Sequence, residues 1–234
     1  MKIIFLCAGK GSRLMPLTKD KPKSLVEVNG KPLLEYTLDN VLDLGYDDLI
    51  FVVGYRGDQI SHHIVKKYLP SKEFKGNVRF INQHKQNGTG VAVYLTKKYM
   101  KNDDFIVLSG DTIFEKKDIE KLIKEKNSLL YTTMKDNRNQ YGTLNMDGNK
   151  VLRINEKQTE NKSNKINCGA YHLDGKIYEY IFNTPPNERF NEIIITDSIN
   201  MMIDDGYDFK RIKIDSLMDI TKPRDIDRLE NDIK

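Results

Sequence analysis

The first half of the chain alternates between short apolar runs and stretches in which apolar residues recur at helical spacing. The apolar runs, rich in β-branched and aromatic residues, predict strands at residues 2–7, 48–53, 78–81 and 104–108. The helical stretches predict helices at residues 32–44, 58–69, 90–100 and 116–126. Because parallel strands need crossover connections, this alternation predicts a mostly parallel sheet with helices on both faces.

The pattern changes after about residue 128. Alternating runs separated by turns such as Asp147-Gly148-Asn149 predict an antiparallel lobe with strands at residues 129–134, 142–146, 151–155 and 166–172. Further helices are predicted at residues 178–182, 196–205 and 223–233. The predicted fold class is therefore α/β, a Rossmann-like, doubly wound, mostly parallel sheet with a small antiparallel lobe. Since no repeat or flexible linker interrupts the chain, we expect a single domain over residues 1–234.

Composition limits the class of protein. At 234 residues and 38% hydrophobic content the chain can bury a substantial core. The apolar run at residues 3–8 is too short to span a bilayer and precedes no cleavage site, which favours a cytoplasmic protein that is not bound to membranes. The 38 basic and 34 acidic side chains are interspersed, so nucleic acid is not implied. Cys7 and Cys168 are expected to be reduced thiols, with a disulfide as the alternative.

The loop after the first predicted strand is the first candidate for chemistry. The run AGKGSRL at residues 8–14 places two glycines, two cations and a hydroxyl directly behind the strand. Glycines let the backbone approach an anion, while exposed N–H groups with Lys10 and Arg13 supply a positive field. A P-loop would need Gly-Lys-Ser/Thr at its end, and the dinucleotide fingerprint a third glycine where Leu14 stands. An ordinary turn between strand and helix is the alternative.

Three segments together, LCAGKGSRL at 6–14, PLT at 16–18 and PK at 22–23, resemble the signature of the sugar-1-phosphate nucleotidylyltransferases. The resemblance implies a GT-A-like fold with a nucleotide-binding part (1–127), a sugar-binding lobe (128–175) and a closing segment (176–234). It implies catalytic roles for Arg13, which would grip the triphosphate near the leaving pyrophosphate, and for Lys23, which would contact the reacting phosphates. The nucleotide-binding residues that it implies in the first segment are Leu6, Cys7, Ala8, Gly9, Gly11 and Ser12.

A second loop, NQHKQNGTG at residues 82–90, lies between a predicted strand and a predicted helix, where a second ligand-facing loop is expected. The Gln83 amide can both donate to and accept from a base edge. The alternative is a solvent loop in which Gly88 and Thr89 start the helix. The segment resembles the family's Gln…Gly-Thr-Gly stretch, which implies uracil binding by these three residues. Thymidylyltransferases more often carry Gly-Leu-Ala there, so the segment favours UTP.

Asp111 ends the apolar run FIVLSGD at residues 105–111, which places it at the same sheet edge as the first loop. Mg²⁺ typically takes one or two carboxylates and leaves its other positions to phosphate and water. A helix N-cap is the alternative role for an aspartate that ends a strand. The family's Gly-Asp motif implies that Asp111 binds Mg²⁺, with Gly110 beside the nucleotide.

The tail segment DSLMDITKPRDI at residues 215–226 resembles the family's closing motif, which places the second metal ligand on Asp219. Two features depart from that motif, because Met218 precedes the aspartate and Thr221-Lys222 replaces Gly-Thr. Asp215 is therefore the alternative ligand. The other role open to Asp219 is the N-cap of the final helix, which Thr221 could also fill.

Three segments of the lobe resemble the family's sugar-binding loops, which implies sugar contacts for Gly142, Glu156 and Asn167. A glutamate accepts hydrogen bonds from vicinal hydroxyls, and an asparagine amide both donates and accepts. Asn167 resembles the UDP-GlcNAc pyrophosphorylases more than the glucose-specific relatives. The four histidines have no partners at metal-ligand spacing and receive no role; they are His62, His63, His84 and His172.

The resemblance predicts an Mg²⁺-dependent enzyme that makes an NDP-sugar and pyrophosphate from an NTP, preferably UTP, and glucose or N-acetylglucosamine 1-phosphate. The alternatives are a CTP-dependent phosphocholine cytidylyltransferase, a dTTP-dependent glucose-1-phosphate thymidylyltransferase and a non-catalytic nucleotide-sugar-binding regulatory subunit. The missing third glycine disfavours an NAD-binding oxidoreductase. The expected partners are these substrates, without nucleic acid or membrane, and a homo-oligomer is left open. Since no hexapeptide repeat follows, no fused acetyltransferase domain is expected.

Overall fold

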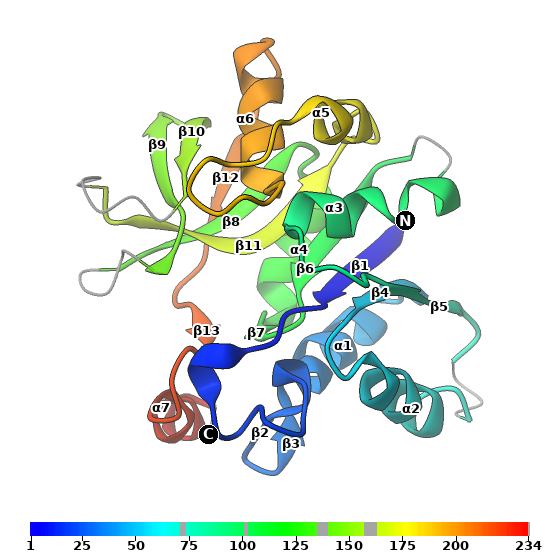
Figure 1. Ribbon diagram of the computed structural model, residues 1–234. Coiled ribbons are helices and arrows are strands. Elements are labelled where there is room, and N and C mark those ends of the chain that lie inside the picture. Colours follow the sequence, from blue (N-terminus) through cyan, green and yellow to red (C-terminus); the bar gives the residue numbers. More distant parts are fainter. Residues whose placement is uncertain (71–73, 101–102, 135–139, 157–162, 234) are drawn as a thin grey trace. The chain divides into compact units, whose positions relative to one another are not determined.

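The computed structural model describes residues 1–70, 74–100, 103–134, 140–156 and 163–233 (Figure 1). The chain forms two compact units. Unit 1 comprises Met1–Gln86, Leu108–Ile119 and Met218–Lys234, and unit 2 comprises Asn87–Val107 and Glu120–Leu217. The predicted α/β class is confirmed, with helices and strands following one another in the predicted order. Within the described ranges, no helix is both long and apolar enough to cross a membrane.

Unit 1 is built on three parallel strands in the order β5-β4-β1, namely β1 (Lys2–Cys7), β4 (Asp48–Val53) and β5 (Asn77–Asn82). The helices α1 (Leu33–Asp43) and α2 (Gly57–Lys67) lie beside these strands in Figure 1. Phe5, Phe51 and Phe80 stack across the strands, with ring centroids 5.0 and 5.5 Å apart. Such stacks bury a large apolar area and so fix the register of these strands. The first loop begins where β1 ends.

A second core of unit 1 joins segments that are far apart in the sequence. The antiparallel pair β7 (Thr112–Ile113) and β13 (Met218–Asp219) lies here, with the hairpin of β2 (Glu27–Val28) and β3 (Lys31–Pro32) and the helix α7 (Asp225–Asp232). Its buried residues are Leu14, Val26, Val28, Leu33, Ile113, Ile220 and Leu229. Burying one such side chain stabilises the fold by about 1.5–3 kcal/mol. Leu14 and Ile220 directly follow Arg13 and Asp219, and Ile113 lies two residues after Asp111. This core therefore positions the backbone next to all three charged residues.

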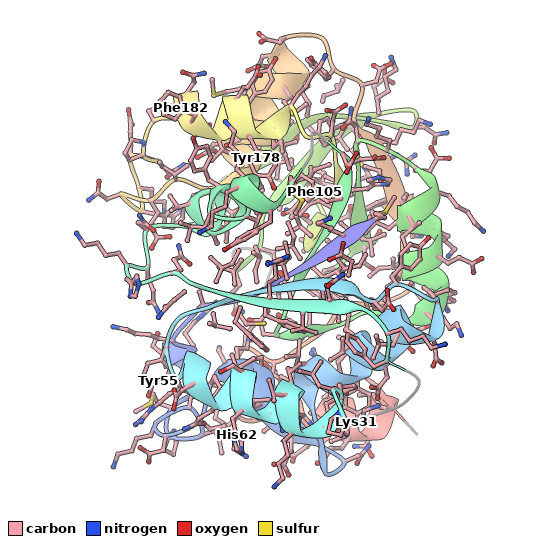
Figure 2. The ribbon with its side chains drawn as sticks, turned by 90° about the vertical axis from the view of Figure 1, so that its right-hand side faces the viewer. Lys31, Tyr55, His62, Phe105, Tyr178 and Phe182 are labelled. Carbon is pink, nitrogen blue, oxygen red and sulfur yellow. The ribbon has the colours of Figure 1, made fainter. Side chains whose placement is uncertain are left out.

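Unit 2 contains a five-stranded array in the order β11-β8-β12-β10-β9. The strands are β8 (Ser128–Thr133), β9 (Thr143–Asp147), β10 (Lys150–Asn155), β11 (Lys165–Leu173) and β12 (Lys210–Lys213). Its helices include α3 (Thr89–Tyr94), α5 (Ile177–Asn183) and α6 (Ile195–Asp204). Figure 2 labels Phe105, Tyr178 and Phe182 of this unit; Phe105 stacks on Tyr178 at 5.3 Å, and Phe182 stacks on Tyr94 at 6.2 Å. The strand β6 (Phe105–Ser109) and the helix α4 (Lys116–Lys124) contain residues of both units.

The structure differs from the predicted elements in a few places. The helix predicted at 90–100 ends at Tyr94 and is followed by a 3₁₀ turn at Lys97–Tyr99. The lobe predicted as antiparallel also contains one parallel pair, because β12 runs parallel to β8. The short strands β2, β3, β7, β12 and β13 were not predicted. Two-residue strands carry no alternating pattern, and the sequence of β12, KRIK, is too polar to indicate a strand.

Candidate active site

The two glycines of the first loop have different surroundings. Gly11 has a left-handed backbone, with φ of +61°, and a Cβ atom there would lie 3.0 Å from Lys23 Cβ and 3.1 Å from Thr18 Cγ2. Its carbonyl accepts hydrogen bonds from the Leu14 N–H at 2.9 Å and the Thr18 hydroxyl at 2.8 Å. A Cβ atom at Gly9 would meet no atom within 4 Å. The fold therefore requires glycine at position 11, whereas Gly9 leaves the backbone open to a ligand.

Polar side chains from the segments that follow β4 and β5, including one from α2, hold the first loop in place. The Tyr55 hydroxyl lies 2.5 Å from the Lys19 carbonyl oxygen and 3.2 Å from that of Thr18. Gln59 Nε2 donates to the Asp20 carbonyl at 2.8 Å, and Gln86 Nε2 donates to the Ala8 carbonyl at 2.9 Å. Sequence reasoning missed Tyr55, Gln59 and Gln86. The one available signal, a position just after the carboxyl end of a strand, applies to Tyr55 and Gln86, whereas Gln59 lies in α2.

The loop brings a lysine onto the candidate metal carboxylate. Lys23, at the start of the 3₁₀ turn Lys23–Leu25, places Nζ 2.6 Å from Asp111 Oδ2. The Lys23 side chain is 13% exposed and that of Asp111 is 40% exposed. Burial of Asp111 raises its pKa, but the Lys23 ammonium, backbone hydrogen bonding and the Arg13 guanidinium outweigh burial and leave the pKa below its ordinary value. The two cations predicted from the sequence, Lys23 and Arg13, thus both act on the ionised carboxylate of Asp111.

The tail brings Asp219 next to the same segment. In the β7–β13 ladder Asp219 is paired with Thr112, the residue after Asp111. Asp219 is 7% exposed, whereas Asp215 is exposed and belongs to unit 2. The position of Asp219 in the β7–β13 ladder favours it over Asp215 as the partner of Asp111.

The helix that follows does not use Asp219 as its cap. Asp225 Oδ2 accepts from the Thr221 N–H, the Thr221 hydroxyl and the Lys222 N–H, each at 2.8 Å. Partial burial raises the Asp225 pKa, but these hydrogen bonds outweigh it and lower the pKa. The helix α7 begins at Asp225, and the residue before it, Arg224, makes no side-chain cap. Neither Asp219 nor Thr221, the caps considered from the sequence, caps α7. The turn before the helix is instead stabilised by Asp225, the first residue of α7.

Gly110 is packed too tightly against Cys7 to accept a larger residue. A Cβ atom at Gly110 would lie 2.2 Å from Cys7 Sγ, and the Gly110 N–H donates to the Leu6 carbonyl at 3.0 Å. Cys7 and Cys168 are both buried free thiols. Burial, followed by the charge of Asp111, raises the pKa of Cys7 despite an opposing interaction with Ser24, which favours the neutral thiol over the nucleophilic thiolate.

Gln83 lines a pocket of about 340 Å³ in unit 1. The residue is 6% exposed, and its backbone N–H donates to the Val53 carbonyl at 2.8 Å. The other residues that line the pocket are Lys10, Gly54, Tyr55, Asn82, His84 and Gln86. Amide groups and Lys10 of the first loop therefore share this pocket, a composition suited to a polar planar ring linked to phosphate.

Gly88 and Thr89 lie in unit 2, where they hold the segment before α6. Gly88 has φ of +111°, and a Cβ atom there would lie 2.1 Å from the Ile193 carbonyl oxygen. The Thr89 hydroxyl accepts a hydrogen bond from the Ile195 N–H at 3.1 Å. These contacts give both residues a packing role, which the sequence did not indicate.

The three residues predicted to bind sugar meet in unit 2. The Gly142 carbonyl accepts from the Asn167 N–H at 2.8 Å, and a Cβ atom at Gly142 would lie 2.9 Å from Glu156 Oε2. Asn167 Nδ2 donates to the Tyr171 hydroxyl at 2.6 Å, and Glu156 Oε2 accepts from the Thr196 hydroxyl at 3.3 Å. Residues from three separate segments thus form one neutral and acidic polar group.

Asp111 and Asp219 suit Mg²⁺ as a pair of hard oxygen ligands. Within the described ranges, His, Cys, Asp and Glu form no group of three or more that could hold a metal ion. Mg²⁺ does not need such a group, because it is commonly bound by one or two carboxylates together with substrate phosphates and water. The ionised state of Asp111 fits that requirement.

The chain is similar to known nucleotidyl transferases along its whole length. A family model described as nucleotidyl transferase matches residues 2–234. The chain is 35% identical over 246 residues to the bifunctional protein GlmU of Methanocaldococcus jannaschii, covering 100% of this chain and 56% of that protein. It therefore spans about half the length of this relative. It is 32% identical over 239 residues to UTP–glucose-1-phosphate uridylyltransferase AglF of Haloferax volcanii, covering 98% of this chain and 95% of AglF.

Solved structures show the same fold. The chain is similar to a UDP-glucose pyrophosphorylase complexed with UDP-glucose, with a TM-score of 0.86 and 20% identity over 99% of this chain and 97% of the other. It is also similar to a UTP-bound UGPase from Acinetobacter baumannii, with a TM-score of 0.78 and 22% identity over 99% and 92% of the two chains. At these identities the likeness is one of fold.

Proposed function

Because the chain belongs to the nucleotidyl transferase family, we propose that it transfers the nucleotidyl group of UTP to glucose or N-acetylglucosamine 1-phosphate and releases pyrophosphate. One observation carries this proposal: Lys23 and Arg13 act on a single carboxylate, Asp111, behind an open glycine loop. The names of two relatives, a UTP–glucose-1-phosphate uridylyltransferase and GlmU, support the choice of reaction.

In the proposed reaction, an oxygen of the sugar phosphate attacks the α-phosphorus of UTP. A new oxygen–phosphorus bond forms, and the bond from the α-phosphorus to the bridging oxygen of the β-phosphate breaks, so its electron pair leaves with pyrophosphate. Two anions approach each other, and negative charge grows on the leaving group. Arg13 and Lys23 lower this barrier by neutralising and positioning the phosphates, and no covalent intermediate on the protein is needed.

Asp111 and Asp219 are the residues that would hold Mg²⁺. When bound, the ion would polarise phosphate oxygens and offset the charge of the triphosphate. Lys23, bonded to Asp111, is positioned beside that carboxylate rather than free in solvent. The loop backbone from Leu6 to Ser12 would approach the phosphates at Gly9, and Gln83 would contact the uracil in its pocket.

In unit 2, Gly142, Glu156 and Asn167 are the proposed contacts of the sugar. The Asn167 amide, which already donates to Tyr171, and the Glu156 carboxylate are the kinds of group that bind hydroxyl or acetamido groups. This polar group is the part of the protein that would distinguish one sugar 1-phosphate from another.

A substrate panel tests the proposal. UTP, dTTP and CTP are each combined with glucose 1-phosphate, N-acetylglucosamine 1-phosphate and phosphocholine, with Mg²⁺ present, and pyrophosphate release is measured. We expect release with UTP and at least one sugar 1-phosphate. Release only with CTP and phosphocholine, or only with dTTP, would replace the proposed substrates. Absence of release from every pair would favour the non-catalytic alternative.

A further inference from the structure

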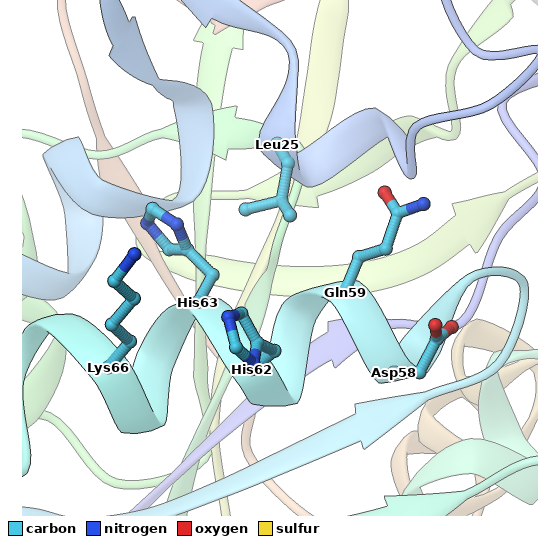
Figure 3. A pocket seen from close by; sticks show the side chains of 6 residues that line it. All are labelled: Leu25, Asp58, Gln59, His62, His63 and Lys66. Atoms are coloured by element: carbon cyan, nitrogen blue, oxygen red, sulfur yellow. The ribbon is translucent and has the colours of Figure 1, made fainter.

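A second pocket of unit 1 lies along α2, and the proposed reaction does not use it. Its volume is about 550 Å³. Figure 3 shows its lining side chains, five from α2 and one from the 3₁₀ turn that begins at Lys23. They are Leu25, Asp58, Gln59, His62, His63 and Lys66. None of these side chains has been assigned to UTP, to the sugar phosphate or to Mg²⁺.

One end of this α2 pocket carries unpaired nitrogen donors. His62 and Lys66 are exposed, and neither side chain forms a hydrogen bond or ion pair with any residue that the structure describes. They are four residues apart, so they are neighbours on one helix face. The buried Glu35 carboxylate does not cancel this charge, because it is already paired with His63 Nε2 at 2.6 Å and Lys67 Nζ at 2.5 Å.

The other end carries oxygen acceptors. Asp58 and Lys66 are eight residues apart, or about 12 Å along the helix axis, so the carboxylate is well separated from the ammonium. Gln59 uses Nε2 to bind the Asp20 carbonyl, which leaves its Oε1 able to accept from a ligand. Leu25, 8% exposed, adds an apolar surface to the lining.

We propose that the α2 pocket binds a phosphate monoester of a small polyol. The phosphate binds at His62 and Lys66, the hydroxyl groups donate to Asp58 and Gln59, and the carbon chain lies against Leu25. A dianion suits the unpaired donors of one end, and hydroxyl groups are the donors that the acceptors of the other end need.

The occupied pocket would also act on the first loop. Leu25 shares a 3₁₀ turn with Lys23, and Gln59 holds the carbonyl of Asp20 at 2.8 Å. A ligand that touches Leu25 and Gln59 therefore contacts both sides of the segment that positions Lys23. Binding is independent of the catalytic role of Lys23, whereas this regulatory effect rests on the proposed function.

Calorimetric titration with glycerol 3-phosphate and with inorganic phosphate tests binding. The proteins are wild type, the double variant His62→Ala/Lys66→Ala, the control Lys124→Ala, which removes an exposed lysine of α4, and Arg13→Ala. We expect wild type to bind glycerol 3-phosphate more tightly than phosphate. The double variant should lose about tenfold or more in affinity, as expected for the loss of about 1.4 kcal/mol of binding free energy, and the other two variants should bind normally.

Three outcomes would overturn the proposal. These are absence of binding to wild type, equal affinity for both probes, and a loss of affinity in Arg13→Ala that the double variant does not share, which would place the ligand in the first loop. Thermal unfolding checks the double variant, whose exposed substitutions should change stability by no more than about 0.5 kcal/mol. If it unfolds early, Lys66→Gln alone replaces it, with the same expected direction.

Turnover separates this inference from the proposed function. We expect glycerol 3-phosphate to change the wild-type rate of pyrophosphate release by about twofold or more, the scale of a weak coupling free energy. The double variant should keep its basal rate and give no response. Binding without pyrophosphate release from any substrate pair would contradict the proposed function and leave the site standing. Normal turnover without binding would contradict the site alone.

Discussion

The candidate phosphate site of unit 1 and the candidate sugar site of unit 2 are built from different interactions. In unit 1, Lys23 and Asp111 form a 2.6 Å ion pair, and Arg13 adds a second positive charge. In unit 2, Asn167 and Glu156 contact the neutral hydroxyls of Tyr171 and Thr196. Charge-assisted hydrogen bonds are roughly twice as strong as neutral ones. The ion-paired site of unit 1 therefore suits rate enhancement, and the site of unit 2, which has no ion pair among these contacts, suits the choice of substrate.

The two sites also differ in how the fold supports them. The second core of unit 1 buries Leu14, Ile113 and Ile220 beside the charged residues, so the positions of those residues follow from apolar packing. The unit 2 group lies at an irregularity of β11, where the pairing with β8 shifts register between Asn167 and Tyr171. Its geometry depends on a few polar contacts. Substitutions of the charged residues of the first site should affect catalysis, and substitutions in the second site should affect binding of the sugar 1-phosphate.

The largest effect is expected from the cations of unit 1. Arg13→Ala and Lys23→Ala should each lower kcat by about 10²–10³-fold, because each removes a positive charge from the transferring phosphates. Initial rates of pyrophosphate release measure this. Lys21→Ala is the matched control, since Lys21 pairs with Glu27 at 3.0 Å on the surface of the same loop. Similar losses in Lys21→Ala would mean that loop charge in general, and not this site, supports the reaction.

A smaller effect should separate the two loop glycines. Gly9→Ala should raise KM for UTP by about tenfold, as expected if the added methyl group costs about 1.4 kcal/mol of binding, without lowering the unfolding temperature, because Cβ meets no protein atom. Gly11→Ala should destabilise the protein by about 1–2 kcal/mol, because its backbone is left-handed. Kinetics and thermal unfolding of both variants check this. An unchanged KM in Gly9→Ala would remove the loop backbone from the nucleotide site.

In unit 2, Asn167→Ala should raise KM for the sugar 1-phosphate by about tenfold, the scale of one lost hydrogen bond, and leave KM for UTP unchanged. Tyr171→Phe removes the same Asn167–Tyr171 hydrogen bond but leaves the amide in place. Steady-state kinetics with each substrate varied in turn compares the two variants. If both raise KM alike, Asn167 acts through Tyr171 and does not contact the sugar.

The smallest effect concerns the turn that follows Asp219. The pKa of Asp225 lies below its ordinary value of 3.8, so its stabilising contribution is fully present above pH 3.8 and is lost as the pH falls through the lower, folded-state pKa. Asp225→Asn should therefore unfold at a lower temperature than wild type at neutral pH. The loss in free energy of unfolding should be less than about 1 kcal/mol, because the carboxylate is partly exposed. The difference should shrink below pH 3.8. A difference that is constant with pH would show that charge is not its cause.

The sequence predicted that the first loop and Asp111 of unit 1 lie near each other, because both follow the ends of strands. The bounds of β1 and β4 agree with their apolar runs to the residue, and Asp111 follows β6 as Gly9 follows β1. Parallel strands that end at one edge bring such residues together, so the nearness of the first loop and Asp111 could be expected. The ion pair between Lys23 and Asp111 was not predicted, because Lys23 lies far along the loop from the end of β1.

Other features could not be read from the chain. The hydrogen bonds of Tyr55, Gln59 and Gln86 to loop carbonyls leave no periodic signal, because exposed polar side chains bind wherever the backbone places an acceptor. The packing role of Thr89 depends on Ile195, more than a hundred residues away. The β7–β13 ladder, with two residues in each strand, is too short to form a pattern, although it places Asp219 opposite Thr112.

The central claim is that nucleotidyl transfer depends on the carboxylate that Lys23 and Arg13 converge upon. UTP labelled at the α-phosphorus is incubated with the preferred sugar 1-phosphate and either wild type or Asp111→Asn, a variant of the same shape without the charge. Wild type should move the label into the NDP-sugar and none into pyrophosphate, and Asp111→Asn, although folded, should transfer it at least about 10²-fold more slowly. Transfer by Asp111→Asn at a rate close to that of wild type would contradict the central claim.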